Sequence, residues 1–157
     1  MKILFVCTGN TCRSVMAEGF LRKLKNVHSA DWLDIKSCGT GATPGLKVPK
    51  IVLKIILDEG VDLSDHISTP VNKLIAGVSD YIFTMEEHHK NEIIRRYPEL
   101  KDRVYLLKEF AINRKLDEPD VADPIGQPDE VYLQAAAEIK GLVEKLFTII
   151  DKKRLEQ

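Results

Sequence analysis

Residues 3–14 are Ile-Leu-Phe-Val-Cys-Thr-Gly-Asn-Thr-Cys-Arg-Ser, and the fold class can be inferred from them. Its first four residues form a continuous apolar run, which is typical of a parallel strand covered by helices on both faces. A short loop containing Gly9 follows, and Ser14 is expected to N-cap a helix with apolar residues at helical spacing. The stretch therefore predicts a buried strand, a tight loop and a helix.

The rest of the chain continues this alternation of strands and helices. Further strands are expected at residues 32–38, 81–84 and 104–107, and helices at residues 48–60, 86–97 and 132–149. The connection 113–129 is rich in Asp and Pro, and an unstructured segment of this length is more often functional than idle. The pattern predicts one α/β domain over residues 1–157, in which a parallel sheet lies between two layers of helices.

Composition and charge exclude several classes of protein. The chain has 23 Lys and Arg against 24 Asp and Glu, so no overall positive field is available to bind nucleic acid or an anionic membrane. The first apolar run ends at Val6, which is too short for a signal segment or a membrane span. We therefore expect no nucleic-acid or membrane partner, and a monomer is compatible with these features.

The cysteines point to a reducing compartment. Cys7, Cys12 and Cys38 are odd in number and confined to the first quarter of the chain, unlike a secreted disulfide framework. A cytoplasmic location is therefore expected. Because no C-x-x-C pair occurs and the histidines are scattered, neither a structural metal nor a cofactor is expected.

The loop from Cys7 to Ser14 has the composition of an anion site. Gly9 permits the positive φ of a tight nest, and the following helix directs its amide donors towards the loop. The helix N-terminus and Arg13 favour the thiolate of Cys7, and the planar fork of Arg13 can hold two phosphoryl oxygens. Ser14 can either cap the helix or donate a hydrogen bond to the thiolate.

These residues resemble the low-molecular-weight protein phosphatases, whose signature is Cys, five residues, Arg, then Ser or Thr near the N-terminus. Further similarities follow in family order: the segments Met16-Ala17-Glu18 and Ser37-Cys38-Gly39-Thr40, then Asp65-His66, then Asp123-Pro124. The resemblance covers essentially the whole chain. It implies a flavodoxin-like, three-layer αβα fold with a four-stranded parallel sheet in the order 2-1-3-4 and about five helices.

The resemblance also assigns roles. Cys7 is the expected nucleophile, Arg13 the phosphate clamp and Asp123 the general acid, with Asp120 as a nearby rival for the acid. Inorganic phosphate and a phosphorylated protein are the expected product and substrate. His66 is expected to brace Asn10, and the remaining loop residues are expected to bind phosphate or support the loop: Thr8, Gly9, Asn10, Thr11, Cys12 and Ser14.

Several residues have more modest interpretations. Cys12 is either a redox partner that forms a disulfide with Cys7 or a small buried residue at the start of the helix. Cys38 is expected in the core. The residues Trp32, His28, His88 and His89 show no pattern of partners and are expected to fill the core or the surface.

The substrate hypothesis depends on Thr11 and Ile125. Tyrosine-specific members of the family usually carry aromatic residues after Asp-Pro, where this chain has Ile125, and in the loop after the second strand. Threonine at position 11 resembles the bacterial protein arginine phosphatases, and its hydroxyl leaves room for a planar guanidinium. Phosphoarginine is therefore favoured over phosphotyrosine, which stays as the alternative.

Two other classes remain as rivals. Thioredoxin-coupled arsenate reductases share the loop but need two further cysteines in the C-terminal half, and none follows Cys38. A non-catalytic phosphoanion-binding protein or a thiol redox protein would not need Asp123, whose presence favours an enzyme.

Overall fold

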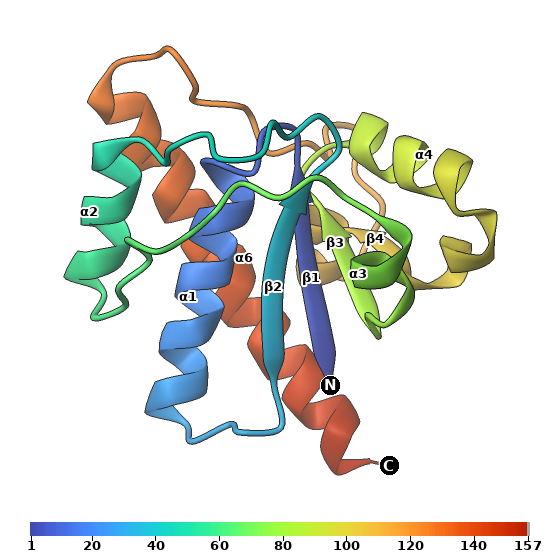
Figure 1. Cartoon of the computed structure of the whole chain (residues 1–157). Helices are drawn as coiled ribbons and strands as arrows, with labels where there is room; N and C mark the ends of the chain where they lie inside the picture. Colours follow the sequence, from blue (N-terminus) through green and yellow to red (C-terminus); the bar gives the residue numbers. More distant parts are fainter. Residues whose placement is uncertain (157) are drawn as a thin grey trace.

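The computed structural model describes residues 1–156 (Figure 1). Four strands, six α-helices and one 3-10 helix, η1, occur in these residues. Their order is β1 Lys2–Cys7, α1 Arg13–Val27, β2 Asp34–Gly39, α2 Lys50–Asp58, α3 Lys73–Gly77, β3 Tyr81–Thr84, α4 Glu87–Arg96, η1 Pro98–Arg103, β4 Val104–Leu106, α5 Leu107–Ile112 and α6 Asp129–Leu155.

The four strands form one parallel sheet in the order β2-β1-β3-β4, as expected from the sequence. Strand β1 is central, with Cys7 opposite Gly39 of β2 and Val6 opposite Thr84 of β3. The carboxyl ends of these strands therefore meet at one edge of the sheet, where ligands bind in open α/β folds.

Helices cover both faces of the sheet, which explains the continuous apolar run of β1. Ile3 and Phe5 belong to a core shared with α1 and α6, whereas Leu4 and Val6 belong to a second core with residues of α3 and α4. Figure 1 shows α1 and α6 on one side of the strands and α3 and α4 on the other. The predicted three-layer αβα architecture is confirmed.

Several local predictions differ from the structure. Strand β2 begins at Asp34, and Trp32 instead stacks on Phe147 with a centroid distance of 6.4 Å. The short elements α3, η1 and α5 were not predicted, because five or six residues are too few to show a helical period. Helix α6 extends beyond the predicted residues 132–149 at both ends.

The connection between α5 and α6 contains no helix or strand over residues 113–128, as predicted. Within the described residues, none of the helices has the length and apolarity to cross a bilayer.

Candidate active site

The loop Thr8–Cys12 joins β1 to α1 at the carboxyl edge of the sheet. The turn after β2 supports it through two hydrogen bonds, from Thr40 N to the carbonyl of Cys7 (2.9 Å) and from Gly41 N to the carbonyl of Thr8 (3.0 Å). A Cβ at Gly39 would lie 2.3 Å from the Thr8 carbonyl oxygen, so only glycine allows this close approach. The loop is thus fixed against β2 as well as α1.

Asn10, not Gly9, adopts the left-handed conformation in the loop, with a φ of 53°. The prediction that Gly9 takes a positive φ is therefore wrong. Asparagine tolerates this conformation better than other residues with a side chain, because its amide forms local hydrogen bonds. Asn10 is fully buried, and its side chain has a partner for each of its polar atoms.

The amide of Asn10 sets the direction of a chain of hydrogen bonds. Its Oδ1 accepts from Thr69 N at 2.9 Å, so its Nδ2 must face the two hydroxyls, Ser14 Oγ and Ser37 Oγ, each at 2.9 Å. Since Ser14 Oγ accepts from Asn10, its single proton is free to point at Cys7 Sγ, 2.9 Å away. Ser14 is placed to stabilise a thiolate.

The same chain of hydrogen bonds continues from Asn10, on the side away from Cys7, to a buried carboxylate. Ser37 donates to Glu18 Oε2 at 2.5 Å, and the other carboxylate oxygen of Glu18 pairs with Arg22 at 2.6 Å. Because a carboxylate only accepts, Ser37 must donate to it and is left to accept from Asn10. Glu18 therefore supports the same direction of donation that the Asn10 amide sets in this chain of hydrogen bonds.

Ser14 is not the N-cap of α1, although the sequence predicted it. Cys12 occupies the cap position without a side-chain hydrogen bond, and α1 begins at Arg13. The Ser14 hydroxyl turns towards Cys7 instead, because Asn10 holds it there. The sequence left open whether Ser14 caps the helix or donates a hydrogen bond to the thiolate, and the geometry matches the second role.

The segment after α2 closes the loop from the other side. His66 Nε2 lies 2.9 Å from the carbonyl oxygen of Asn10, which places it where the sequence expected a brace. Ser68 Oγ donates to the carbonyl of Gly9 at 2.7 Å. Three consecutive loop carbonyls, those of Thr8, Gly9 and Asn10, thus have partners from outside the loop.

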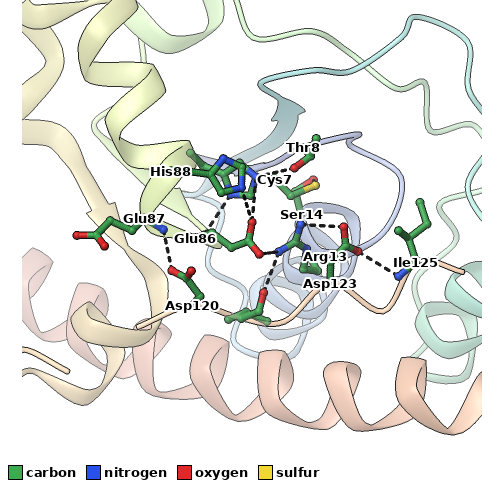
Figure 2. A network of polar contacts seen from close by, with 12 residues as sticks. Cys7, Thr8, Arg13, Ser14, Glu86, Glu87, His88, Asp120, Asp123 and Ile125 are labelled. Carbon is green, nitrogen blue, oxygen red and sulfur yellow. Dashed lines mark hydrogen bonds and ion pairs between the residues drawn. The ribbon is translucent and has the colours of Figure 1, made fainter. Parts of the chain in front are cut away.

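Arg13 is buried, with 2% of its side chain exposed, and is surrounded by acceptors (Figure 2). Its Nη1 lies 3.0 Å from Glu86 Oε1 and donates to the carbonyl of Val121 at 2.8 Å, while its Nη2 lies 3.2 Å from Asp123 Oδ2. A buried guanidinium needs such partners, and charged acceptors give the strongest hydrogen bonds. The three contacts orient the planar fork beside Cys7 and Ser14.

The two candidate acids are used differently. Asp123 faces Arg13, and its Oδ1 accepts from Ile125 N at 3.1 Å, so the carboxylate is held within the site. Asp120 Oδ1 accepts from Glu87 N at 2.7 Å, at the start of α4. The structure therefore places Asp123 beside the loop and assigns Asp120 to the support of α4.

Glu86 and His89 are site residues that the sequence reasoning missed. The Glu86 side chain accepts from the backbone of His89, and His89 Nδ1 accepts from Glu86 N at 3.1 Å, which forms a capping box at the start of α4. The other ring nitrogen, Nε2, lies 2.7 Å from Thr8 Oγ1. Their position just beyond β3, next to β1 in a parallel sheet, was the signal that could have found them.

His89 is neutral at physiological pH. Burial, with smaller contributions from the nearby charges of His88 and Arg13, lowers its pKa to about 3. Since Nδ1 accepts from a backbone amide, the ring proton lies on Nε2 and is donated to Thr8. His89 therefore anchors the exposed side of the loop, beyond the role of core filling that the sequence suggested.

Glu86, His88 and His89 are also the one group in residues 1–156 with the spacing of metal ligands, within 4.8 Å of one another. Both ring nitrogens of His89 already have partners, however, and Glu86 Oε1 is bound to Arg13. A metal would have to break these contacts. The donor set is therefore better suited to holding Arg13 than to holding an ion.

All three cysteines are free thiols and buried. Burial raises the pKa of Cys12 to about 12, with a smaller contribution in the same direction from Cys7, so Cys12 stays protonated near neutral pH. Burial likewise raises the pKa of Cys38, a core residue as expected. Cys12 is thus buried at the start of α1, which is one of its two interpretations, and the alternative, a disulfide with Cys7, stays a prediction.

The two predicted specificity residues lie in different environments. Thr11 is 6% exposed and makes no side-chain hydrogen bond within residues 1–156, but its hydroxyl oxygen reaches the surface of the loop. Ile125 is 56% exposed, directly after the turn that holds Asp123.

Comparison with known proteins identifies the family. The family model described as "Low molecular weight phosphotyrosine protein phosphatase" matches residues 2–156. A "Protein-arginine-phosphatase" of Geobacillus stearothermophilus is 34% identical over 92% of this chain and 93% of that protein.

Solved structures of both kinds of phosphatase resemble the chain. A structure of YwlE arginine phosphatase, in a mutant with a phosphorylated active-site serine, matches with a TM-score of 0.90 at 29% identity over the full length of both chains. A low molecular weight protein tyrosine phosphatase of T. tengcongensis matches with a TM-score of 0.86 at 37% identity, over 94% of this chain and 98% of that chain. The chain therefore belongs to the low molecular weight phosphotyrosine protein phosphatase family and is a protein phosphatase, a hydrolase whose substrates are phosphoproteins.

Proposed function

We propose that the chain removes phosphate from phosphoarginine in proteins through a cysteinyl-phosphate at Cys7. The observation that carries the substrate preference is the Thr11 hydroxyl, which has no partner in residues 1–156 and lies at the surface of the phosphate loop. A free hydroxyl there can hold a water or a guanidinium N–H, whereas a branched aliphatic side chain would crowd the planar group.

The proposed reaction has two displacements. The Cys7 thiolate attacks phosphorus, the P–N bond breaks, and Asp123 protonates the leaving guanidine nitrogen. Water then attacks the cysteinyl-phosphate, Asp123 takes its proton, and the S–P bond breaks to release inorganic phosphate and the thiolate. Arg13 and the loop amides stabilise the equatorial oxygens in both steps. All the groups that act belong to the chain, so the mechanism uses no metal or cofactor.

The geometry around Cys7 supports this chemistry. Ser14 Oγ at 2.9 Å from the sulfur favours the thiolate before attack and as a leaving group. Asp123 and Arg13 are already in contact at 3.2 Å, so the acid stands next to the group that holds the phosphate. The phosphorylated active-site serine of the YwlE mutant is consistent with a covalent intermediate at the equivalent position.

The surroundings of Asp123 support phosphoarginine further. The positions that would present aromatic rings to a phenol are occupied by Ile125 and Gly126, and the turn after β2 is Thr40-Gly41-Ala42. Tyr132, whose pKa is raised mainly by burial and to a smaller extent by the carboxylate of Asp123, is only 6% exposed. The phenol ring of phosphotyrosine would therefore find little aromatic surface to stack on.

Phosphotyrosine is the second candidate, because the tyrosine phosphatase of T. tengcongensis shares 37% of its residues with this chain. The mechanism would be the same, with Asp123 protonating a phenolate oxygen. The monomeric state and the cytoplasmic location stay predictions.

The test compares two substrates on four proteins. The ratio of kcat/KM for a phosphoarginine protein to that for a phosphotyrosine peptide is measured for the wild type, Thr11→Val, Thr11→Ile and Thr11→Ser. Valine replaces the hydroxyl by a methyl group of similar size, and we expect the ratio to fall by about tenfold, the value of one hydrogen bond, while serine keeps the hydroxyl and the ratio. A ratio unchanged in Thr11→Val removes Thr11 as the determinant, and a wild type that prefers phosphotyrosine supports the second candidate.

A further experiment separates an enzyme from a binding or redox protein. Hydrolysis of p-nitrophenyl phosphate should be abolished in Cys7→Ser and slowed in Asp123→Asn. An inactive wild type under reducing conditions would contradict the enzymatic reading.

A further inference from the structure

A groove of about 520 Å³ lies at the outer edge of the sheet, beside the edge strand β4. Its volume falls in the range of about 300–1,000 Å³ that is typical of binding sites. Basic side chains from three separate elements line it: Lys90 from α4, Lys101 from η1, and Arg114 and Lys115 from the segment after α5. The groove is therefore built by tertiary structure and does not reflect one basic run of sequence.

The groove carries an excess of positive charge. Two acidic residues, Asp102 and Glu109, line it together with the four cations, and Glu109 already pairs with Lys115 at 3.2 Å. Lys90, Lys101 and Arg114 form no ion pair within residues 1–156. Because the whole chain has a net charge of −1, this concentration of cations is local.

Aromatic rings form the apolar part of the lining. Tyr105 and Phe110 pack edge to face at 5.1 Å, and Phe110 also packs against the buried Phe83 at 4.9 Å. Rings held in this way are rigid, so they offer apolar contact area without a further loss of side-chain entropy. A rigid aromatic floor with a cationic rim fits a segment that alternates carboxylates with apolar side chains.

The groove adjoins the active site through α4. Lys90 lines the groove, and its neighbour His89 contacts Thr8 of the phosphate loop. The connection that starts at Arg114 leads to Asp123, which contacts Arg13. Helix α4 and the connection after α5 therefore both link the groove to the active site.

We propose that this groove docks an acidic, extended segment of the phosphoprotein substrate, at some distance along the chain from the phosphorylated residue. That the docked segment belongs to a substrate rests on the proposed function. That the groove binds an acidic peptide does not depend on it. Docking raises the effective concentration of the phosphorylated residue at Cys7, so it acts through KM and not through the chemical step.

The binding test uses a fluorescein-labelled peptide of alternating Glu and Val, with a Lys-Val peptide as its counterpart. Fluorescence anisotropy measures the binding of each to the wild type, to Lys101→Glu/Arg114→Glu and to Lys145→Glu/Lys153→Glu. The last variant makes the same change of charge at exposed positions of α6, outside the groove. Neither pair of residues touches the phosphate loop.

We expect the Glu-Val peptide to bind the wild type, to bind the groove variant about tenfold or more weakly, and to bind the α6 control like the wild type. Salt should weaken binding, since exposed charges are screened. Failure of the wild type to bind, or equal binding by the groove variant, overturns the proposal. Equal capture of single-stranded DNA with the same dependence on the groove residues also overturns it, because the site would then take any polyanion.

The catalytic arm uses a phosphoarginine peptide with and without an attached Glu-Val segment. The groove variant should lose the advantage of the acidic segment through a higher KM at an unchanged kcat, and should hydrolyse the short substrate like the wild type. An unchanged KM for the longer substrate contradicts docking. If neither substrate is hydrolysed, the proposed phosphoarginine activity fails while the peptide-binding result still decides the groove.

Discussion

Replacement of Asn10 by aspartate tests whether the direction of the hydrogen bonds beneath Cys7 matters. Aspartate keeps the shape of the side chain and still accepts from Thr69 N through the atom that replaces Oδ1, 2.9 Å away in the wild type. At the position of Nδ2, however, a donor becomes an acceptor. Ser14 then donates to residue 10 and has no proton left for Cys7, while Ser37 can donate either to residue 10 or to Glu18.

The expected losses of activity and stability in Asn10→Asp follow from the hydrogen bonds that it breaks. The bond from Ser14 to the thiolate is one hydrogen bond to a charged group, worth about 1.5–3 kcal/mol, so kcat/KM should fall by about 10- to 150-fold. Ser37 has one proton for two carboxylates, so either the new aspartate or Glu18 loses the hydrogen bond from Ser37. That second loss should lower the free energy of unfolding by about the same 1.5–3 kcal/mol.

The assay is kcat/KM for p-nitrophenyl phosphate together with urea unfolding, both at pH 7. Ser14→Ala is the matched control, because it removes the contact with Cys7 but leaves Ser37 free to donate to Glu18. We expect the two variants to lose similar activity, and Asn10→Asp to lose more stability. A folded Asn10→Asp protein with wild-type kcat/KM would refute the argument from hydrogen-bond direction.

Three further predictions address other parts of the site. Glu86→Gln keeps the helix cap but removes one of two carboxylate charges on Arg13, so kcat/KM for p-nitrophenyl phosphate should fall by about fivefold to tenfold; an unchanged value would show that Asp123 suffices. Because the pKa of His89 is about 3 in the folded chain against 6.5 ordinarily, its contribution to stability is full above pH 6.5 and is lost as the pH falls towards 3. Urea unfolding of His89→Gln should accordingly depend less on pH in this window, by at most about 1.4 kcal/mol per pH unit, and an equal dependence would contradict the assignment. Cys12, whose pKa is about 12, should resist iodoacetamide at pH 7.5 in the folded protein, as read by peptide mass mapping; alkylation at the rate of the unfolded chain would disprove this.

Local sequence patterns predicted the parts of the fold that depend on neighbouring residues. The run before Cys7 predicted a strand buried on both faces, and Ile3 and Leu4 do point into two different cores. The family resemblance, not a local pattern, implied that Asp123 acts beside the loop, and it lies 3.2 Å from Arg13. Short elements such as α3 and α5 escaped prediction, because periodicity needs more residues than they contain.

Two predictions for the phosphate loop were wrong because more than one residue or role fitted the same local pattern. Gly9 and Asn10 are adjacent, and both tolerate a positive φ, but the buried partners of the Asn10 amide select Asn10. Serine is a favoured N-cap residue, but the hydroxyl of Ser14 accepts a hydrogen bond from Asn10 and lies beside Cys7 instead. In both cases the deciding atoms belong to segments distant in sequence, such as Ser37 and Thr69.

The chemical groups of the site follow from the sequence alone, because Cys7 and Arg13 lie at the two ends of one short loop whose spacing brings them together. The contacts of Arg13 depend instead on the tertiary fold: they are the carbonyl of Val121, 108 residues further along the chain, and the carboxylate of Glu86 beyond β3. No local pattern encodes such partners. They meet because a parallel sheet gathers the carboxyl ends of its strands at one edge, and a buried guanidinium is stable only where that edge supplies acceptors.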